Sequence, residues 1–199
     1  MTEELKEFLV EKLDNLINRI DDTYLNELCN RLVGKEGKYR QEFLIAPAAK
    51  GMHHAYPGGL LEHSLEVADF CISDYETLRN YYKYDNLNLN VMLAASLLHD
   101  LAKIQEYMVV DMYDGNTLYS ITETGKMIGH LCLSAMWVYS EIDNINNFPQ
   151  DLKEHLIHIL LSHHGRTEWG AAVLPKTIEA EFFHTADHRS AMIANSRYN

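Results

Sequence analysis

Histidine and aspartate residues that are typical metal ligands form an ordered series along this chain of 199 residues. The pair His99-Asp100 follows directly on the apolar run 91–98. One histidine precedes the pair and four residues follow it, so that the series is His63, His99, Asp100, His130, His163, His164 and Asp187. Imidazole nitrogen and carboxylate oxygen bind divalent metals such as Mn, Fe, Ni, Co or Zn. We therefore predict a site for one or two divalent metal ions.

Asp100 is the member of the series that could bridge two metals, because a carboxylate has two oxygens whereas each histidine gives one nitrogen. Two neighbouring metals can share a water molecule, lower its pKa and supply hydroxide near neutral pH. Lys103 lies three residues after Asp100, so on a helix it would return to the same side and could hold a phosphate oxygen. We predict Asp100 and Lys103 as the catalytic residues. On its own, Lys103 would equally fit a lysine at the surface end of a helix.

The elements that must position these residues are predicted to be helices. Apolar residues at spacings of three and four indicate an amphipathic helix over 3–20. A second helix is expected from a cap at Asp21 or Asp22 to about Val33, and a short one within 38–50. Further helices are predicted over 60–81, 88–104, 122–142, 151–164 and 176–196. Each offers its ligand near an end or on an inward face, so a bundle can bring the ligands together.

Two short β-prone runs on either side of Asp114-Gly115-Asn116 predict a hairpin around 106–121. The expected fold class is therefore all-α, a helical bundle with a small β-hairpin insertion. Residues 1–45 are expected to form an N-terminal helical extension packed on the domain, and 46–199 the domain itself. The apolar first helix could cover the domain's own core or a second subunit, which leaves a homo-oligomer as one alternative.

The composition, 47% hydrophobic and 23% charged, is that of one ordinary globular domain. Three scattered cysteines without a CxxC pair indicate reduced thiols, and hence a cytoplasmic location. The start of the chain resembles no signal peptide, no apolar run is long enough to span a membrane, and no membrane partner is expected. The net charge of −12 disfavours broad binding to duplex nucleic acid. A nucleic-acid end could still enter a metal-charged pocket.

A single histidine is more often a hydrogen-bonded structural residue than a ligand. We expect that plain role for several histidines outside the series, namely His53, His155, His158, His184 and His188. The complete ordered set is much harder to explain in this way.

At these residues the chain resembles the HD-domain superfamily of metal-dependent phosphohydrolases. Its pattern of a histidine, an HD dyad and a distal aspartate is matched over about 45–195. The resemblance implies two ligand sets that share Asp100. The first metal would be held by His63, His99, Asp100 and Asp187, and the second by Asp100, His130, His163 and His164.

The flanking segments give a narrower resemblance. HHAYPGGLLEH at 53–63, LHDLAK at 98–103 and LSHHG at 161–165 are similar to the HD module of bacterial 3′→5′ exoribonucleases. The first segment also resembles a module in some conjugative-transfer proteins. By position, His54 and Arg166 would contact phosphate, and Tyr56 and Trp169 would stack a base. Packing and loop anchoring are the alternative roles of Tyr56 and Trp169.

The sequence thus predicts a phosphohydrolase that uses metal-activated water. Its expected substrate is a phosphate ester, foremost a phosphodiester in single-stranded nucleic acid or a short oligonucleotide. Hydrolysis of free nucleotides is one alternative. A non-catalytic, metal-stabilised interaction module is another.

Overall fold

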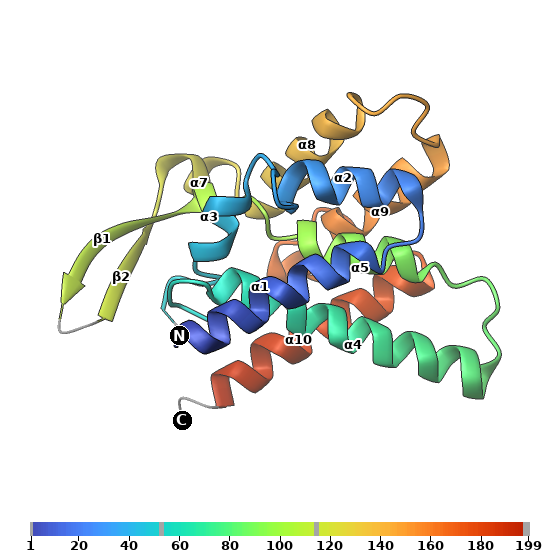
Figure 1. The fold of residues 1–199 in the computed structure, drawn as a ribbon, viewed down its shortest axis with the longest axis horizontal. Coiled ribbons are helices and arrows are strands. Elements are labelled where there is room, and N and C mark those ends of the chain that lie inside the picture. The colour runs from blue at the N-terminus through green and yellow to red at the C-terminus, as the bar shows by residue number, and fades with distance from the viewer. Residues whose placement is uncertain (1, 52–53, 114–115, 197–199) are drawn as a thin grey trace.

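A computed structural model describes residues 2–51, 54–113 and 116–196 of the chain. His53 and the predicted hairpin turn at Asp114-Gly115 lie outside the described residues. The helices are α1 Glu3–Asn18, α2 Thr23–Val33, α3 Arg40–Ile45, α4 Gly59–Tyr82, α5 Leu89–Leu98, α6 Lys103–Glu106, α7 Glu123–Met127, α8 His130–Ile142, α9 Gln150–Ser162 and α10 Ile178–Ser196. A 3-10 turn, Thr167–Trp169, and two strands, β1 Tyr107–Tyr113 and β2 Asn116–Ile121, complete the order. The predicted all-α fold with a small β-hairpin is confirmed (Figure 1).

Helix α5 lies at the centre of the bundle. It begins where the side chain of Asn88 accepts a hydrogen bond from the backbone N–H of Val91, at 3.1 Å. Every residue of 91–98 is buried, and α5 contacts α2, α4, α9 and α10. A helix that is apolar on all sides is stable only when other elements surround it. The helix therefore holds its C-terminal end, with His99-Asp100, firmly inside the molecule.

Two helices that the sequence predicts as continuous are each divided in the structure. The helix predicted over 88–104 ends at Leu98, and a tight turn with hydrogen bonds between residues three apart leads into α6. The helix predicted over 122–142 is broken at Gly129, whose φ of 76° is one that glycine adopts readily and other residues rarely do. Both predictions of continuity were wrong. The two breaks place Asp100 and His130 at chain bends near the same centre.

The N-terminal helices share the core of the rest of the chain. Leu13 of α1 and Leu25 and Leu28 of α2 are fully buried in one apolar cluster with residues of α4 and α5. Helix α1 packs on α4, and α2 packs on α5 (Figure 1). Residues 2–33 therefore cover apolar surface of the bundle.

The hairpin extends from the bundle beside α7 and α3 (Figure 1). Its strands are antiparallel, with Val109 opposite Tyr119 and a register shift between Val109 and Asp111. Within the described ranges, no helix combines the length and the apolar character needed to cross a membrane.

Candidate metal centre

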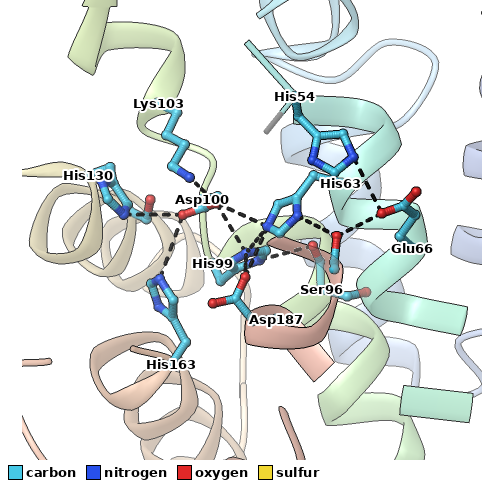
Figure 2. Close-up of polar contacts among 12 residues, drawn as sticks. His54, His63, Glu66, Ser96, His99, Asp100, Lys103, His130, His163 and Asp187 are labelled. Carbon is cyan, nitrogen blue, oxygen red and sulfur yellow. Dashed lines mark hydrogen bonds and ion pairs between the residues drawn. The ribbon is translucent and has the colours of Figure 1, made fainter. Parts of the chain in front are cut away.

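Asp100 lies between two groups of histidines, in the turn that follows α5, and is only 2% exposed. Its Oδ2 is 3.4 Å from Nε2 of His63 and 3.3 Å from Nε2 of His99. Its Oδ1 is 3.3 Å from Nε2 of His130 and 3.7 Å from Nε2 of His163. Each carboxylate oxygen thus faces a different group of ring nitrogens (Figure 2).

The first group combines His63 of α4, His99 at the end of α5 and Asp187 of α10. Oδ1 of Asp187 is 3.0 Å from Nε2 of His63 and 3.6 Å from Nε2 of His99. These three residues offer ligand atoms that all lie within 4.8 Å of one another. Three separate helices therefore meet at a spacing that one metal ion can bridge.

The second group combines His130, the first residue of α8, with His163 and His164 at the end of α9. Nε2 of His130 lies 3.3 Å from Nε2 of His164. The ligand atoms of this group also lie within 4.8 Å of one another. The structure thus brings all seven predicted ligands into two adjoining groups around Asp100.

Backbone carbonyls fix the orientation of two of the rings. Nδ1 of His99 is 3.2 Å from the carbonyl oxygen of Ser96, and Nδ1 of His163 is 2.7 Å from that of Leu160. A carbonyl oxygen only accepts hydrogen bonds, so Nδ1 must carry the proton in each ring. In the neutral form of either ring, Nε2 then directs a lone pair toward Asp100.

Side chains that the sequence analysis did not single out hold the other rings. Nδ1 of His130 is 2.7 Å from Oε2 of Glu106. Nδ1 of His63 is 2.9 Å from the hydroxyl of Ser190, which donates to Oε2 of Glu66 at 2.8 Å. Partners of this kind orient metal-bound histidines and raise their basicity. Helical spacing was an available signal for two of them, because Ser190 lies three residues after Asp187 and Glu66 three after His63.

The convergence of these acceptor atoms fits a divalent cation. Among the described residues, Oδ1 of Asp100 and Nε2 of His163 are buried without a hydrogen-bond donor. Buried polar atoms in native proteins nearly always have a partner, and leaving one unpaired is costly. A mixed set of imidazole nitrogens and carboxylate oxygens suits Mn, Fe, Co, Ni or Zn.

The charges of the protein groups differ between the two sets. Burial opposes the charged form of His99, but Asp100 and Asp187 outweigh it and raise the pKa of His99 to about 10. Burial also opposes ionisation of Asp100, yet His99 and Lys103 hold its pKa well below the usual range. Burial and the neighbouring His99 and His164 instead lower the pKa of His163 well below its usual value. A metal bound by the first set must therefore displace a proton, whereas His163 in the second set is already neutral.

Lys103 pairs with Asp100 and lines a cavity at the centre. Its Nζ is 2.6 Å from Oδ2 of Asp100, and it lines a cavity of about 260 Å³ together with ligands of both sets. Burial opposes the charge of this lysine, but Asp100 outweighs that effect and raises the pKa of Lys103. The ammonium group therefore stays charged at the edge of the cavity, where an anionic substrate could reach it.

Trp169 forms part of the cavity wall with His184 and His188. Its ring stacks on that of His188 with centroids 5.4 Å apart and an angle of 8° between planes. The guanidinium carbon of Arg166 lies 4.7 Å from the centroid of Trp169. Arg166 and Trp169 are thus close to the site, and their contacts with substrate stay predictions. Two of the histidines expected to be structural, His155 and His158, form hydrogen bonds just before α10. The partner of His155 is the hydroxyl of Thr177, and the backbone N–H of Lys176 donates to His158.

His54 and Tyr56 lie on the other side of the centre, near α4. His54 is 1% exposed, its ring centroid is 5.5 Å from that of His63, and its Nε2 is 3.4 Å from Oε2 of Glu66 (Figure 2). The hydroxyl of Tyr56 donates to Oε2 of Glu62 at 2.6 Å. The structure therefore places His54 beside the candidate ligand His63 and beside Glu66. The contacts of His54 and Tyr56 with substrate stay predictions.

The sequence model of one protein family matches this chain over residues 60–192, under the description HD domain. The match covers more than half of the chain and includes all seven candidate ligands. No solved structure matches the chain. The fold, the order of the ligands and the family match agree. The chain therefore belongs to the HD domain family, whose members are in general metal-dependent phosphohydrolases.

Proposed function

We propose that the protein hydrolyses a phosphodiester in single-stranded nucleic acid or a short oligonucleotide. The observation that carries the proposal is the position of Asp100, whose two oxygens face two separate ligand groups beside a cavity. Divalent metals bound there would supply a hydroxide near neutral pH and neutralise charge on the phosphoryl group.

The chain's own residues would then bind and orient the ester. His63, His99 and Asp187 would hold one metal, His130, His163 and His164 the other, and Asp100 would contact both. Lys103, charged and at the cavity edge, would donate a hydrogen bond to a phosphate oxygen. Arg166 would offer a second, forked contact from beside Trp169.

One observation supports nucleic acid as the substrate class, and a second restricts the form of the nucleic acid. The segments at 53–63, 98–103 and 161–165 resemble the HD module of bacterial exoribonucleases. The net charge of −12 disfavours a long duplex held along the surface. A strand end placed in the cavity would lie close to the charged Lys103.

The test is a hydrolysis screen with Mn²⁺ supplied and bound metals quantified in the same sample. It includes bis-p-nitrophenyl phosphate, 5′-labelled single-stranded RNA and DNA, and a panel of free nucleotides. Asp100→Asn is expected to lose at least about a hundredfold in kcat, because one electrostatic contact at a reacting centre is commonly worth that much. Asp85→Asn, at an exposed aspartate, serves as the matched control and should retain wild-type turnover.

Each outcome of this screen supports one of the candidate functions. Cleavage of labelled strands that Asp100→Asn abolishes supports the proposal, and the product ladder gives the polarity. Cleavage of free nucleotides alone would replace it by a nucleotidase. Two bound metals without turnover would favour an interaction module, and a protein that binds no metal would contradict the metal centre itself.

A further inference from the structure

A second cavity of about 320 Å³ adjoins the metal centre, and Lys103 lines both. The first cavity contains the metal-facing side chains, whereas the second lies between the β-hairpin and the segment around the end of α3. A molecule whose phosphate contacts Lys103 would therefore lie beside the second cavity.

One face of the hairpin forms a wall of this second cavity. Tyr107 and Val109 contribute from β1, and Thr117 and Tyr119 from β2. Val109 and Tyr119 are directly opposite each other in the sheet register. Val110, the residue left unpaired by the register shift after Val109, is not part of this wall. Val109 and Val110 are nevertheless almost equally exposed, at 53% and 54%.

The opposite wall is also mainly apolar. It includes Ile45, Ala46 and Pro47 at the end of α3, with Pro57 and Ile104 between the walls. Besides Lys103 and the two tyrosines, Glu42 and Thr117 are the residues of this lining with polar side chains. Apolar walls with a few polar groups are typical of sites for small organic groups, and the volume is at the low end of their range.

We propose that this hairpin cavity binds the nucleobase of the nucleotide whose phosphate lies at the metal centre, which rests on the proposed function. A nucleobase is flat and uncharged, so it can lie against Tyr107 or Tyr119 without repelling the acidic chain. Glu42 can accept a hydrogen bond from an exocyclic amine, and Thr117 can donate or accept one. The phosphate at Lys103 and the base in the hairpin cavity would then fix the direction of the substrate.

The first test locates the base without relying on turnover. 5-Iodo-2′-deoxyuridine 5′-monophosphate is irradiated with the Mn²⁺-loaded protein, and the cross-linked peptide is identified by mass spectrometry. We expect a cross-link at Tyr107 or Tyr119. A cross-link at Trp169, or none at the two tyrosines, overturns the inference.

The second test compares two esters with the same leaving group, thymidine 5′-(p-nitrophenyl phosphate) and methyl p-nitrophenyl phosphate. We expect the wild-type kcat/KM to favour the nucleoside ester about tenfold or more, as base stacking commonly allows. Val109→Asp and Ile45→Asp, which alter opposite walls, should lower this ratio toward one. Val110→Asp places the same charge on the neighbouring residue, which does not line the cavity, and should keep the wild-type ratio.

The outcomes separate the two proposals. Equal wild-type rates on both esters overturn the base site while leaving phosphohydrolase activity in place. An equal loss of the ratio in Val109→Asp and Val110→Asp also overturns it, because the effect would not depend on the cavity. Absence of turnover on either ester counts against the proposed function, and the cross-link still decides where the base binds.

Discussion

Nε2 of each histidine that contacts Asp100 faces it because a hydrogen-bond acceptor on the other side of the ring holds a proton on Nδ1. Glu106 accepts from His130, and Ser190 accepts from His63 while donating to Glu66. The hydrogen bond from His130 and its charge keep the pKa of Glu106 below its usual value, although burial opposes this. The ligands are therefore oriented before a metal arrives, which reduces the cost of ordering them.

Ser190→Ala should weaken metal binding by about 10–100-fold, the usual effect of removing a partner of a metal-bound histidine. The loss arises because Nδ1 of His63 would no longer have its buried acceptor at 2.9 Å. Isothermal titration with Mn²⁺ measures the affinity. Ser196→Ala, at an exposed serine of the same helix, should bind metal as the wild type does. Equal affinities in both variants would show that Ser190 does not position the ligand.

For individual residues, the sequence shows which side chains can bind metal but not which groups hydrogen-bond to them. His63 through Asp187 could be predicted as a set because imidazole and carboxylate groups are evident in the sequence itself. Glu106 lies 24 residues before His130, and the packing of α6 against α8 brings them together. Hydrogen-bond partners of this kind depend on tertiary packing, which local spacing does not encode.

Among the elements, amphipathic periodicity predicted the helices well, and the exceptions are two bends. Gly129 lies inside a pattern that would suit one long helix, and a glycine inside a helix is tolerated locally. Its positive φ nevertheless separates α7 from α8. The turn at 99–102 likewise interrupts a sequence with good helix formers. In both places packing around the site, not local preference, determines where the helix ends.

Helix α1 offers a direct measure of what the N-terminal residues contribute to the core. Leu13 is fully buried and Leu5 is 38% exposed on the same helix. Leu13→Ala should lower the free energy of unfolding by about 2–5 kcal/mol, because it removes buried methyl groups and leaves a cavity. Leu5→Ala, the same substitution at the surface, should cost much less. Urea unfolding followed by circular dichroism makes the comparison, and equal losses would mean that α1 does not belong to the cooperative core.

For the whole molecule, the proton on His99 links pH to both stability and metal binding. The raised pKa of His99, about 10, stabilises the metal-free fold fully below its unfolded pKa of about 6.5, and this is lost as pH rises toward 10. The lowered pKa of Asp100 acts in the opposite direction. Its stabilisation is present above about pH 4 and is lost on acidification. The metal-free protein should therefore be most stable between about pH 4 and about pH 6.5.

Metal addition should raise the melting temperature more at about pH 8.5 than at about pH 6. Binding displaces the proton of His99, so affinity should increase by up to about 1.4 kcal/mol per pH unit in this range. Scanning calorimetry with Mn²⁺ or with a chelator at each pH measures the increment. The same increment at both pH values would show that no proton leaves His99 on binding.

The order of the candidate ligands along the chain has a consequence for protein synthesis. They begin at His63 in α4 and end at Asp187 in α10, so a nascent chain lacks a complete first ligand set until α10 has emerged from the ribosome. An unfinished chain then holds His63 and His99 without the carboxylate of α10. Truncated products that lack α10 would therefore bind metal at the first set more weakly than the complete chain.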